Sequence, residues 1–196
     1  MSKLSHLKSP YFKDNISYDC NRDSNYGIVD YPMEGSKVDK VLKEAMQLGV
    51  ETEAKTTSKN LDLRKVNCWR INQLNSITSE ILAQATVELN KIYNYKLSGF
   101  QDIQYLEYHE GGKYDWHVDI GNAEAGMRKI SITWVLNSGF IGGDLQFFGE
   151  GGEIITYNST PDKLVSFTSF FHHRVTPVKK GIRKCIVAWA FGDTWK

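Results

Sequence analysis

The segment that decides the fold is YHEGGKYDWHVD, residues 108–119. It ends in a His-x-Asp pair, His117 and Asp119, and a further histidine, His173, follows far downstream. Arg183 comes ten residues after that histidine. Two imidazoles and one carboxylate can occupy one face of an octahedral metal and leave its other positions open, which suits Fe(II) that must bind a cosubstrate and dioxygen. The spacing therefore favours a metal enzyme built on strands.

Length and composition fit a globular protein. A chain of 196 residues buries roughly 70% of its unfolded surface, so it can form a real core. Apolar residues make up 41% and aromatic residues 12% of the sequence, which is not the composition of a disordered protein. The net charge of +1 argues against binding to nucleic acid through bulk charge. We expect no nucleic-acid partner.

The cysteines and the N-terminus predict where in the cell the protein is located. Cys20, Cys68 and Cys185 are odd in number and lack the spacing of a metal site or a disulfide framework. A reduced, intracellular environment is the simplest interpretation. The polar N-terminus lacks the apolar core of a signal peptide, and no later segment has the length of a membrane span. We expect a soluble, cytoplasmic protein without a membrane partner.

Two segments have the apolar spacing of amphipathic helices. The first runs from about residue 36 to Gly49, which is a plausible helix stop. The second runs over residues 76–93, with Asn75 or Ser76 as candidate N-terminal caps. The first 35 residues show no reliable periodicity, so loop, short strand and arm all stay open there.

Beyond Gly99 the apolar period changes from helical to alternating. Gly-rich and Asn-rich turns separate the candidate strands. Such a run predicts a mostly β (α+β) protein, a jelly-roll-like double sheet covered by two helices. A further short strand is expected near 65–71, after a polar loop at 51–63. The eight expected strands lie near 102–109, 114–118, 129–137, 144–148, 153–157, 163–168, 171–176 and 183–191.

Alternation also sorts side chains by face. Arg183 heads an otherwise apolar row, and a guanidinium there needs a partner, because an unpaired buried charge costs several kcal/mol. Asp102 or Glu107 could be that partner. His173 lies on the apolar face of its strand and His172 on the other, so His173 is the better inward candidate, with His172 as the alternative.

Five blocks of sequence resemble the Fe(II)- and 2-oxoglutarate-dependent dioxygenase superfamily, and within it the prolyl-4-hydroxylase-like (PKHD-type hydroxylase-like) branch. The likeness covers roughly residues 100–191. A lone His-x-Asp pair is weak evidence, but five blocks in order are a strong signal. They are Tyr108-x-x-Gly111-Gly112-x-Tyr114-x-x-His117-x-Asp119, RKISITWVLN at 128–137, Gly142-Gly143-Asp144-Leu145, His173-x-Val175-x-Pro177-Val178, and Gly181-x-Arg183 followed by Trp189.

The resemblance implies a fold and residue roles. The fold would be a double-stranded β-helix (jelly roll, cupin-like) within a single domain, residues 1–196, in which residues 1–99 supply the two supporting helices and substrate-facing loops. His117, Asp119 and His173 would hold the metal and form the catalytic centre. Arg183 would form a bidentate salt bridge with the distal carboxylate of 2-oxoglutarate. The other expected cosubstrate contacts are Tyr108, which could instead be a core tyrosine, and Ser131, Thr133, Leu145 and Val175.

The resemblance also implies a reaction. The protein would hydroxylate a C–H bond with Fe(II), 2-oxoglutarate and O2, give succinate and CO2 as coproducts, and use ascorbate as a candidate reductant. The favoured substrate is a prolyl residue of a protein or peptide. Oxidation of a free amino acid or small metabolite is the alternative. Base demethylation has little support, because the second arginine of that branch is replaced by Trp189. A noncatalytic metal-binding jelly roll is the rival from another class.

Overall fold

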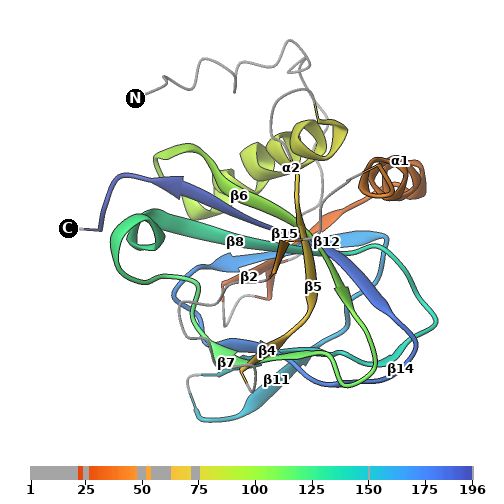
Figure 1. Cartoon of the computed structure of the whole chain (residues 1–196). Helices are drawn as coiled ribbons and strands as arrows, with labels where there is room; N and C mark the ends of the chain where they lie inside the picture. The colour runs from red at the N-terminus through yellow and green to blue at the C-terminus, as the bar shows by residue number, and fades with distance from the viewer. Residues whose placement is uncertain are drawn as a thin grey trace.

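The computed structural model describes residues 22–23, 27–47, 52–53, 63–71, 76–149 and 151–195. Its architecture is three layers, with two helices on one side, a large sheet in the middle and a smaller sheet on the other side (Figure 1). All pairings between neighbouring strands are antiparallel. This is the mostly β, double-stranded β-helix fold that the sequence predicts, and the fold prediction is confirmed.

The large sheet has eight strands, and the long central pair β15 and β6 forms its spine. Its edges are short strands, which limits the unpaired backbone that an edge exposes. In spatial order the strands are β1 (Arg22–Asp23), β2 (Ile28–Pro32), β12 (Lys163–Thr168), β8 (Arg128–Val135), β15 (Arg183–Gly192), β6 (Leu97–Tyr108), β5 (Asn67–Arg70) and β3 (Thr52–Glu53).

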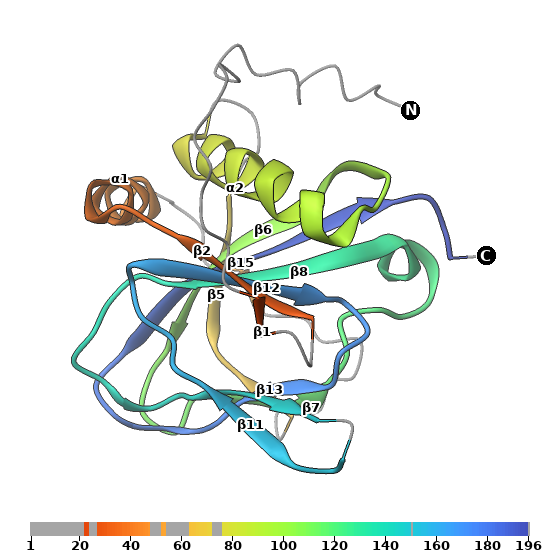
Figure 2. The ribbon, with the colours of Figure 1, turned by 180° about the vertical axis from the view of Figure 1, so that it is seen from behind.

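The small sheet faces the large one (Figure 2) and carries two of the three predicted metal ligands, His117 and His173. In spatial order its strands are β11 (Ile154–Tyr157), β10 (Leu145–Phe148), β13 (His173–Val175), β7 (Lys113–His117) and β4 (Arg64–Lys65). A separate two-stranded ribbon is formed by β14 (Val178–Lys180) and β9 (Ile141–Gly142).

The helices α1 (Gly35–Ala45) and α2 (Ile77–Tyr93) lie on the outer face of the large sheet. Ser76 is the N-terminal cap of α2, where its hydroxyl accepts a hydrogen bond from the Ser79 backbone N–H at 3.1 Å. The second predicted helix is therefore confirmed. The first ends at Ala45, four residues before the predicted stop. Gly49 and Asn75 lie outside the described residues.

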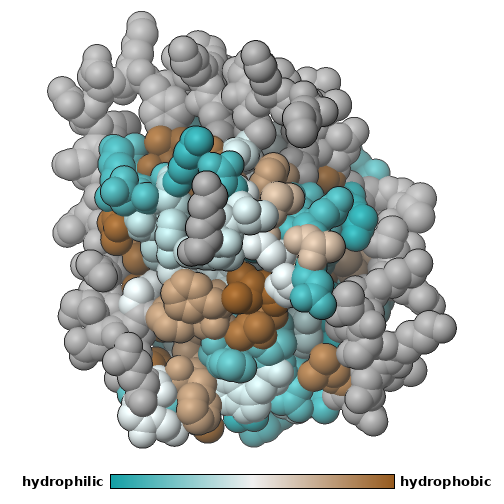
Figure 3. All heavy atoms as spheres, turned by 90° about the vertical axis from the view of Figure 1, so that its left-hand side faces the viewer, coloured by the Kyte–Doolittle hydropathy of each residue, from teal (hydrophilic) through white to brown (hydrophobic). Residues whose placement is uncertain are grey.

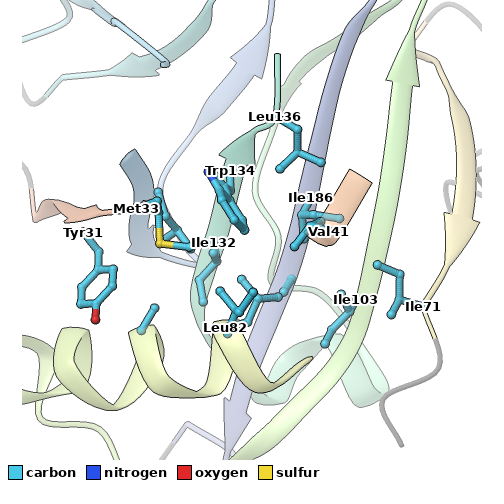
Figure 4. Packing of buried hydrophobic residues seen from close by; sticks show 14 of the residues in the cluster. Tyr31, Met33, Val41, Ile71, Leu82, Ile103, Ile132, Trp134, Leu136 and Ile186 are labelled. Atoms are coloured by element: carbon cyan, nitrogen blue, oxygen red, sulfur yellow. The ribbon is translucent and has the colours of Figure 1, made fainter. Parts of the chain in front are cut away.

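The main core fills the space between the helices and the large sheet (Figure 4). Leu82 of α2 and Val41 of α1 are fully buried there, beside Ile132 and Trp134 of β8 and Ile186 of β15. Fully burying each such aliphatic side chain contributes about 1.5–3 kcal/mol. This core supports the sheet from the face opposite the site.

A second apolar cluster lies between the two sheets. It includes Leu106, Val135, Phe147, Phe167 and Cys185, all with at most 2% of their surface exposed. Each comes from an inward-facing position of its strand. Two of its members, Leu106 and Phe167, also line the pocket that contains the polar site.

Several elements differ from the sequence expectations. Strand β12 matches the predicted 163–168, but β6 begins at Leu97 rather than near 102. A short strand, β2, lies within the N-terminal region, one of the possibilities left open there. The ribbon of β9 and β14 and a 3-10 helix at Ala123–Met127 were not predicted. Most of the 51–63 loop lies outside the described residues.

The surface is mixed in character. On the face drawn in Figure 3, hydrophobic residues gather in a small central group beside hydrophilic ones. Exposed hydrophobic residues that occur singly are normal on soluble proteins. In the described part of the chain, no helix combines the length and the apolar character needed to cross a membrane.

Candidate metal and cosubstrate site

Strand pairing in the small sheet brings the His-x-Asp pair and the distant histidine together. His117 on β7 lies directly across from His173 on β13. Asp119 follows two residues after β7, where its backbone N–H donates to the Ser169 carbonyl at 2.9 Å. One ligand atom from each of the three side chains lies within 4.8 Å of the others. The grouping is compact enough to hold one metal ion.

Both imidazole rings are held by backbone carbonyls. The His117 Nδ1 donates to the Asp115 carbonyl at 2.7 Å, and the His173 Nδ1 donates to the Phe171 carbonyl at 2.9 Å. A carbonyl oxygen only accepts, so each Nδ1 must carry the proton and each Nε2 presents a lone pair. Each Nε2 lies 3.5 Å from an oxygen of Asp119. Such outer hydrogen bonds fix the tautomer that binds a metal.

The charge states also suit a cation. Burial alone would raise the pKa of Asp119, but the charges of His173 and His117 and the Ser131 hydroxyl hold that pKa well below its usual range. The Ser131 Oγ donates to Asp119 Oδ2 at 2.6 Å. Burial lowers the pKa of His173 to about 4, against the opposing charge of Asp119. At neutral pH this pair supplies an ionised carboxylate and a neutral imidazole.

The donor set fits Fe(II). Two imidazole nitrogens and one carboxylate on one side of a site are typical of non-haem Fe(II) oxygenases, which keep the remaining positions for other ligands. The alternative ligand, His172, is exposed and lies outside this group.

Arg183 is the second feature of the site. Its side chain is fully buried, and its Nη1 donates to the Cys185 Sγ at 3.0 Å. Its Nε and Nη2 have no hydrogen-bond partner among the described residues. The two carboxylates considered as partners in the sequence pair elsewhere: Asp102 with Arg70 at 3.4 Å, and Glu107 with Lys184 at 3.5 Å. A buried guanidinium with two free donors is a ready binding site for a carboxylate.

The structure places the other predicted contacts in one pocket with the three candidate ligands. Tyr108 lies across from Arg183 in the β6 and β15 pairing, and the Arg183 Cζ is 5.4 Å from the centre of its ring. Burial raises the pKa of Tyr108, so its hydroxyl stays a neutral donor. Tyr108, Ser131, Thr133, Leu145 and Val175 all line the pocket that contains His117, Asp119 and His173.

Tyr114 was not predicted as a site residue. Its ring stacks on the His117 ring with 3.4 Å between centroids. Strict alternation would put residues three apart on opposite faces. A register shift between His173 and Val175 in the β13 and β7 pairing brings both rings into the pocket. The sequence does not predict that Tyr114 lies in the pocket, because no local pattern indicates the register shift.

Comparison with known proteins assigns this segment to a family. A sequence profile of the 2OG-Fe(II) oxygenase superfamily matches residues 103–191, the stretch that contains the three candidate ligands and Arg183. Residues 103–191 thus match the superfamily that the sequence resembles. A PKHD-type hydroxylase of Synechococcus sp. (strain CC9605) is 33% identical over 81 residues, or 40% of this chain. That match spans 36% of the relative's length.

Solved structures of two prolyl hydroxylases share the fold over most of this chain. A prolyl-4-hydroxylase of Pseudomonas putida superposes with a TM-score of 0.71 at 21% identity, covering 85% of this chain and 94% of the other. A prolyl hydroxylase of Trichoplax adhaerens, in complex with a peptide fragment of hypoxia inducible factor, gives 0.72 at 21% identity, with 86% and 84% covered. These similarities establish the double-stranded β-helix architecture.

Proposed function

We propose that this chain is an Fe(II)- and 2-oxoglutarate-dependent hydroxylase that acts on a prolyl residue of a protein or peptide. One observation carries the proposal. The compact group of His117, Asp119 and His173 lines one pocket together with Tyr108. Tyr108 lies across the strand pairing from Arg183, which is fully buried and has two unpartnered donors among the described residues. A metal and a dicarboxylate together would satisfy both. A noncatalytic metal module would have no need for the buried guanidinium.

The residues divide the work in the proposed reaction. His117, Asp119 and His173 would hold the metal, with Ser131 and two backbone carbonyls keeping them oriented. Arg183 would bind the distal carboxylate of 2-oxoglutarate, while Tyr108 supplies a neutral hydroxyl donor. Leu145 and Val175, paired across β10 and β13, would limit the access of water. When bound, Fe(II) with 2-oxoglutarate supplies dioxygen activation, and succinate and CO2 are the coproducts.

The prolyl substrate is the finer part of the proposal. The sequence relative is named as a PKHD-type hydroxylase, and two structures of the same fold are prolyl hydroxylases, one of them with a bound peptide. Ascorbate as a reductant belongs to the same proposal. Mass spectrometry of prolyl peptides incubated with the iron-loaded protein, 2-oxoglutarate and O2 would test the substrate through a gain of one oxygen.

The cofactor chemistry is tested before the substrate. Apoprotein is titrated anaerobically with Fe(II) and 2-oxoglutarate while the visible metal-to-cosubstrate charge-transfer band is followed. We expect a band in the wild-type protein, no band in His173→Ala, and a band that needs far more 2-oxoglutarate in Arg183→Ala. Metal binding without any band in the wild-type protein would refute the proposed function and favour a metal-binding module.

A further inference from the structure

The pocket contains a second guanidinium that the proposed reaction leaves unused. Arg64, on the edge strand β4, lines the pocket together with the three candidate metal ligands. Its Cζ lies 4.8 Å from the centre of the Tyr114 ring, which in turn stacks on His117. Tyr114 is therefore the one ring that links the Arg64 guanidinium to a candidate metal ligand.

Arg64 has spare hydrogen-bonding capacity. Its Nη2 donates to the Gln104 Oε1 at 3.3 Å, slightly beyond the usual length of such a bond. Its Nε is buried and has no partner among the described residues. No carboxylate of the described part of the chain forms an ion pair with it. A half-buried guanidinium in this state is a site for an external anion.

The charge balance favours an anion as well. Arg128 lies next to this region, with its Nη1 donating to the Asp119 carbonyl at 3.1 Å and its Cζ 4.2 Å from the Trp189 ring centre. With cofactors bound, Asp119 and the two carboxylates of 2-oxoglutarate would carry three negative charges. Fe(II), Arg183 and Arg64 would carry four positive charges. The pocket is left with excess positive charge.

We infer that the substrate carries a carboxylate close to the carbon that is oxidised, and that Arg64 binds this group. The inference rests on the proposed function, because Arg183 and the metal account for both carboxylates of 2-oxoglutarate. Among the described pocket-lining residues, Arg64 is the one arginine or lysine, so it is the charged group left to meet the substrate. The carboxylate could belong to an acidic residue beside the target in a peptide or to a free amino acid.

Two pairs of probes differ only in that charge. N-acetyl-prolyl-aspartate amide is compared with N-acetyl-prolyl-asparagine amide, and L-proline with L-prolinamide. Binding at millimolar concentrations is measured by NMR on protein loaded with Zn(II) and saturated with 2-oxoglutarate, so no turnover is needed. Tighter binding of the aspartate peptide than of the asparagine peptide indicates that the substrate is an acidic peptide. Tighter binding of L-proline than of L-prolinamide indicates that the substrate is a free amino acid.

Variants assign the preference to Arg64. We expect the anionic member of one pair to bind at least about tenfold more tightly, in line with one desolvated charge pair. Arg64→Gln should abolish that preference and Arg64→Lys should retain part of it. Arg174→Gln is the matched control, because that arginine lies over Trp116 and bonds Gln146, away from the pocket lining. This variant should keep the full preference.

The outcomes separate this inference from the proposed function. Binding of 2-oxoglutarate is measured first on the same samples, and its failure in the wild-type protein refutes the proposed function. With 2-oxoglutarate bound, equal affinity for both members of each pair, or no binding of either anionic probe, overturns the inference alone. The inference is also overturned if Arg64→Gln keeps the preference. A loss of 2-oxoglutarate affinity in Arg64→Gln as large as in Arg183→Gln would assign Arg64 to the cosubstrate instead.

Discussion

At the scale of single residues, Arg183 links stability to binding. Its guanidinium is desolvated, yet among the described residues its one hydrogen-bond partner is a thiol, and it lies over the Tyr108 ring. An incompletely compensated buried charge is unfavourable for folding. The chain keeps it at a position where a ligand carboxylate would complete its hydrogen bonds. Stability and cosubstrate affinity should therefore respond in opposite directions when this charge is removed.

Replacement of Arg183 by Gln tests that relation. We expect the affinity for 2-oxoglutarate, measured by calorimetry on Mn(II)-loaded protein, to fall at least about 100-fold, because a desolvated charge pair contributes 2–5 kcal/mol. The free energy of unfolding of the apoprotein should stay the same or rise. Lys184→Gln changes the adjacent residue, which pairs with the partly buried Glu107; it serves as the control and should keep wild-type affinity. Unchanged 2-oxoglutarate binding in Arg183→Gln would rule out the assigned role.

Ser131 provides a second residue-scale prediction. Its hydroxyl donates to Asp119 and lies 3.0 Å from the Ser169 hydroxyl, so it fixes the carboxylate orientation. Ser131→Ala should weaken Mn(II) binding by about tenfold, the lower end of the range for such outer contacts. Electron paramagnetic resonance of free Mn(II) gives the affinity. Ser166→Ala removes another buried hydroxyl, one that bonds the Val29 carbonyl and Tyr93, and should affect stability only. Equal Mn(II) affinity in both variants would contradict the positioning role.

At the scale of elements, the two helices are joined by one carboxylate. Glu44 of α1 accepts hydrogen bonds from the Ser76 hydroxyl, from the backbone N–H groups of Ile77 and Thr78, and from the Thr78 hydroxyl. A carboxylate at a helix N-terminus satisfies free N–H groups and interacts favourably with the helix dipole. Glu44 is thus a cap for α2 that is supplied by another helix.

Glu44→Ala should lower the free energy of unfolding by about 2 kcal/mol, because two backbone N–H groups and two hydroxyls lose their partner. Urea denaturation followed by circular dichroism measures this loss. Glu88→Gln removes a carboxylate on α2 that pairs with Lys91 at the surface, and should change stability by less than about 0.5 kcal/mol. Mn(II) affinity should persist in both variants, since the helices cover the face of the sheet opposite the site. A loss in Glu44→Ala no larger than in Glu88→Gln would show that the cap is unimportant.

Comparison of elements shows what the sequence can predict here. The apolar stripe of α2 and the alternation of β12 specify their elements locally, and both were predicted within one residue at each end. Alternation also identified the inward face of Arg183 and His173. The stacking of Tyr114 on His117 depends on a register shift between two strands about sixty residues apart, and β2 depends on its pairing with β12. Such features arise from tertiary pairing, which local periodicity does not encode.

At the scale of the whole molecule, the site joins the two sheets. Asp119 and His173 belong to the small-sheet side, whereas Arg183, Tyr108 and Ser131 come from the large sheet. A metal and 2-oxoglutarate bound together would connect both sheets across the inter-sheet cluster. Ligand binding to the native state alone stabilises it by mass action. Binding of the metal and 2-oxoglutarate at this site should therefore raise the thermal stability of the whole chain.

We expect Mn(II) with 2-oxoglutarate to raise the midpoint of thermal unfolding by roughly 5–10 °C. At about 100 times the dissociation constant, a ligand adds about 2.7 kcal/mol, and each kcal/mol shifts a chain of this size by about 2–4 °C. Differential scanning calorimetry would measure the shift, and a chelator should reverse it. 2-Oxoglutarate without metal should give a much smaller shift, because Arg183 alone would hold it. In His173→Ala, the rise in midpoint caused by Mn(II) with 2-oxoglutarate should disappear. A rise of wild-type size in that variant would mean that the group of His117, Asp119 and His173 does not hold the metal beside the cosubstrate.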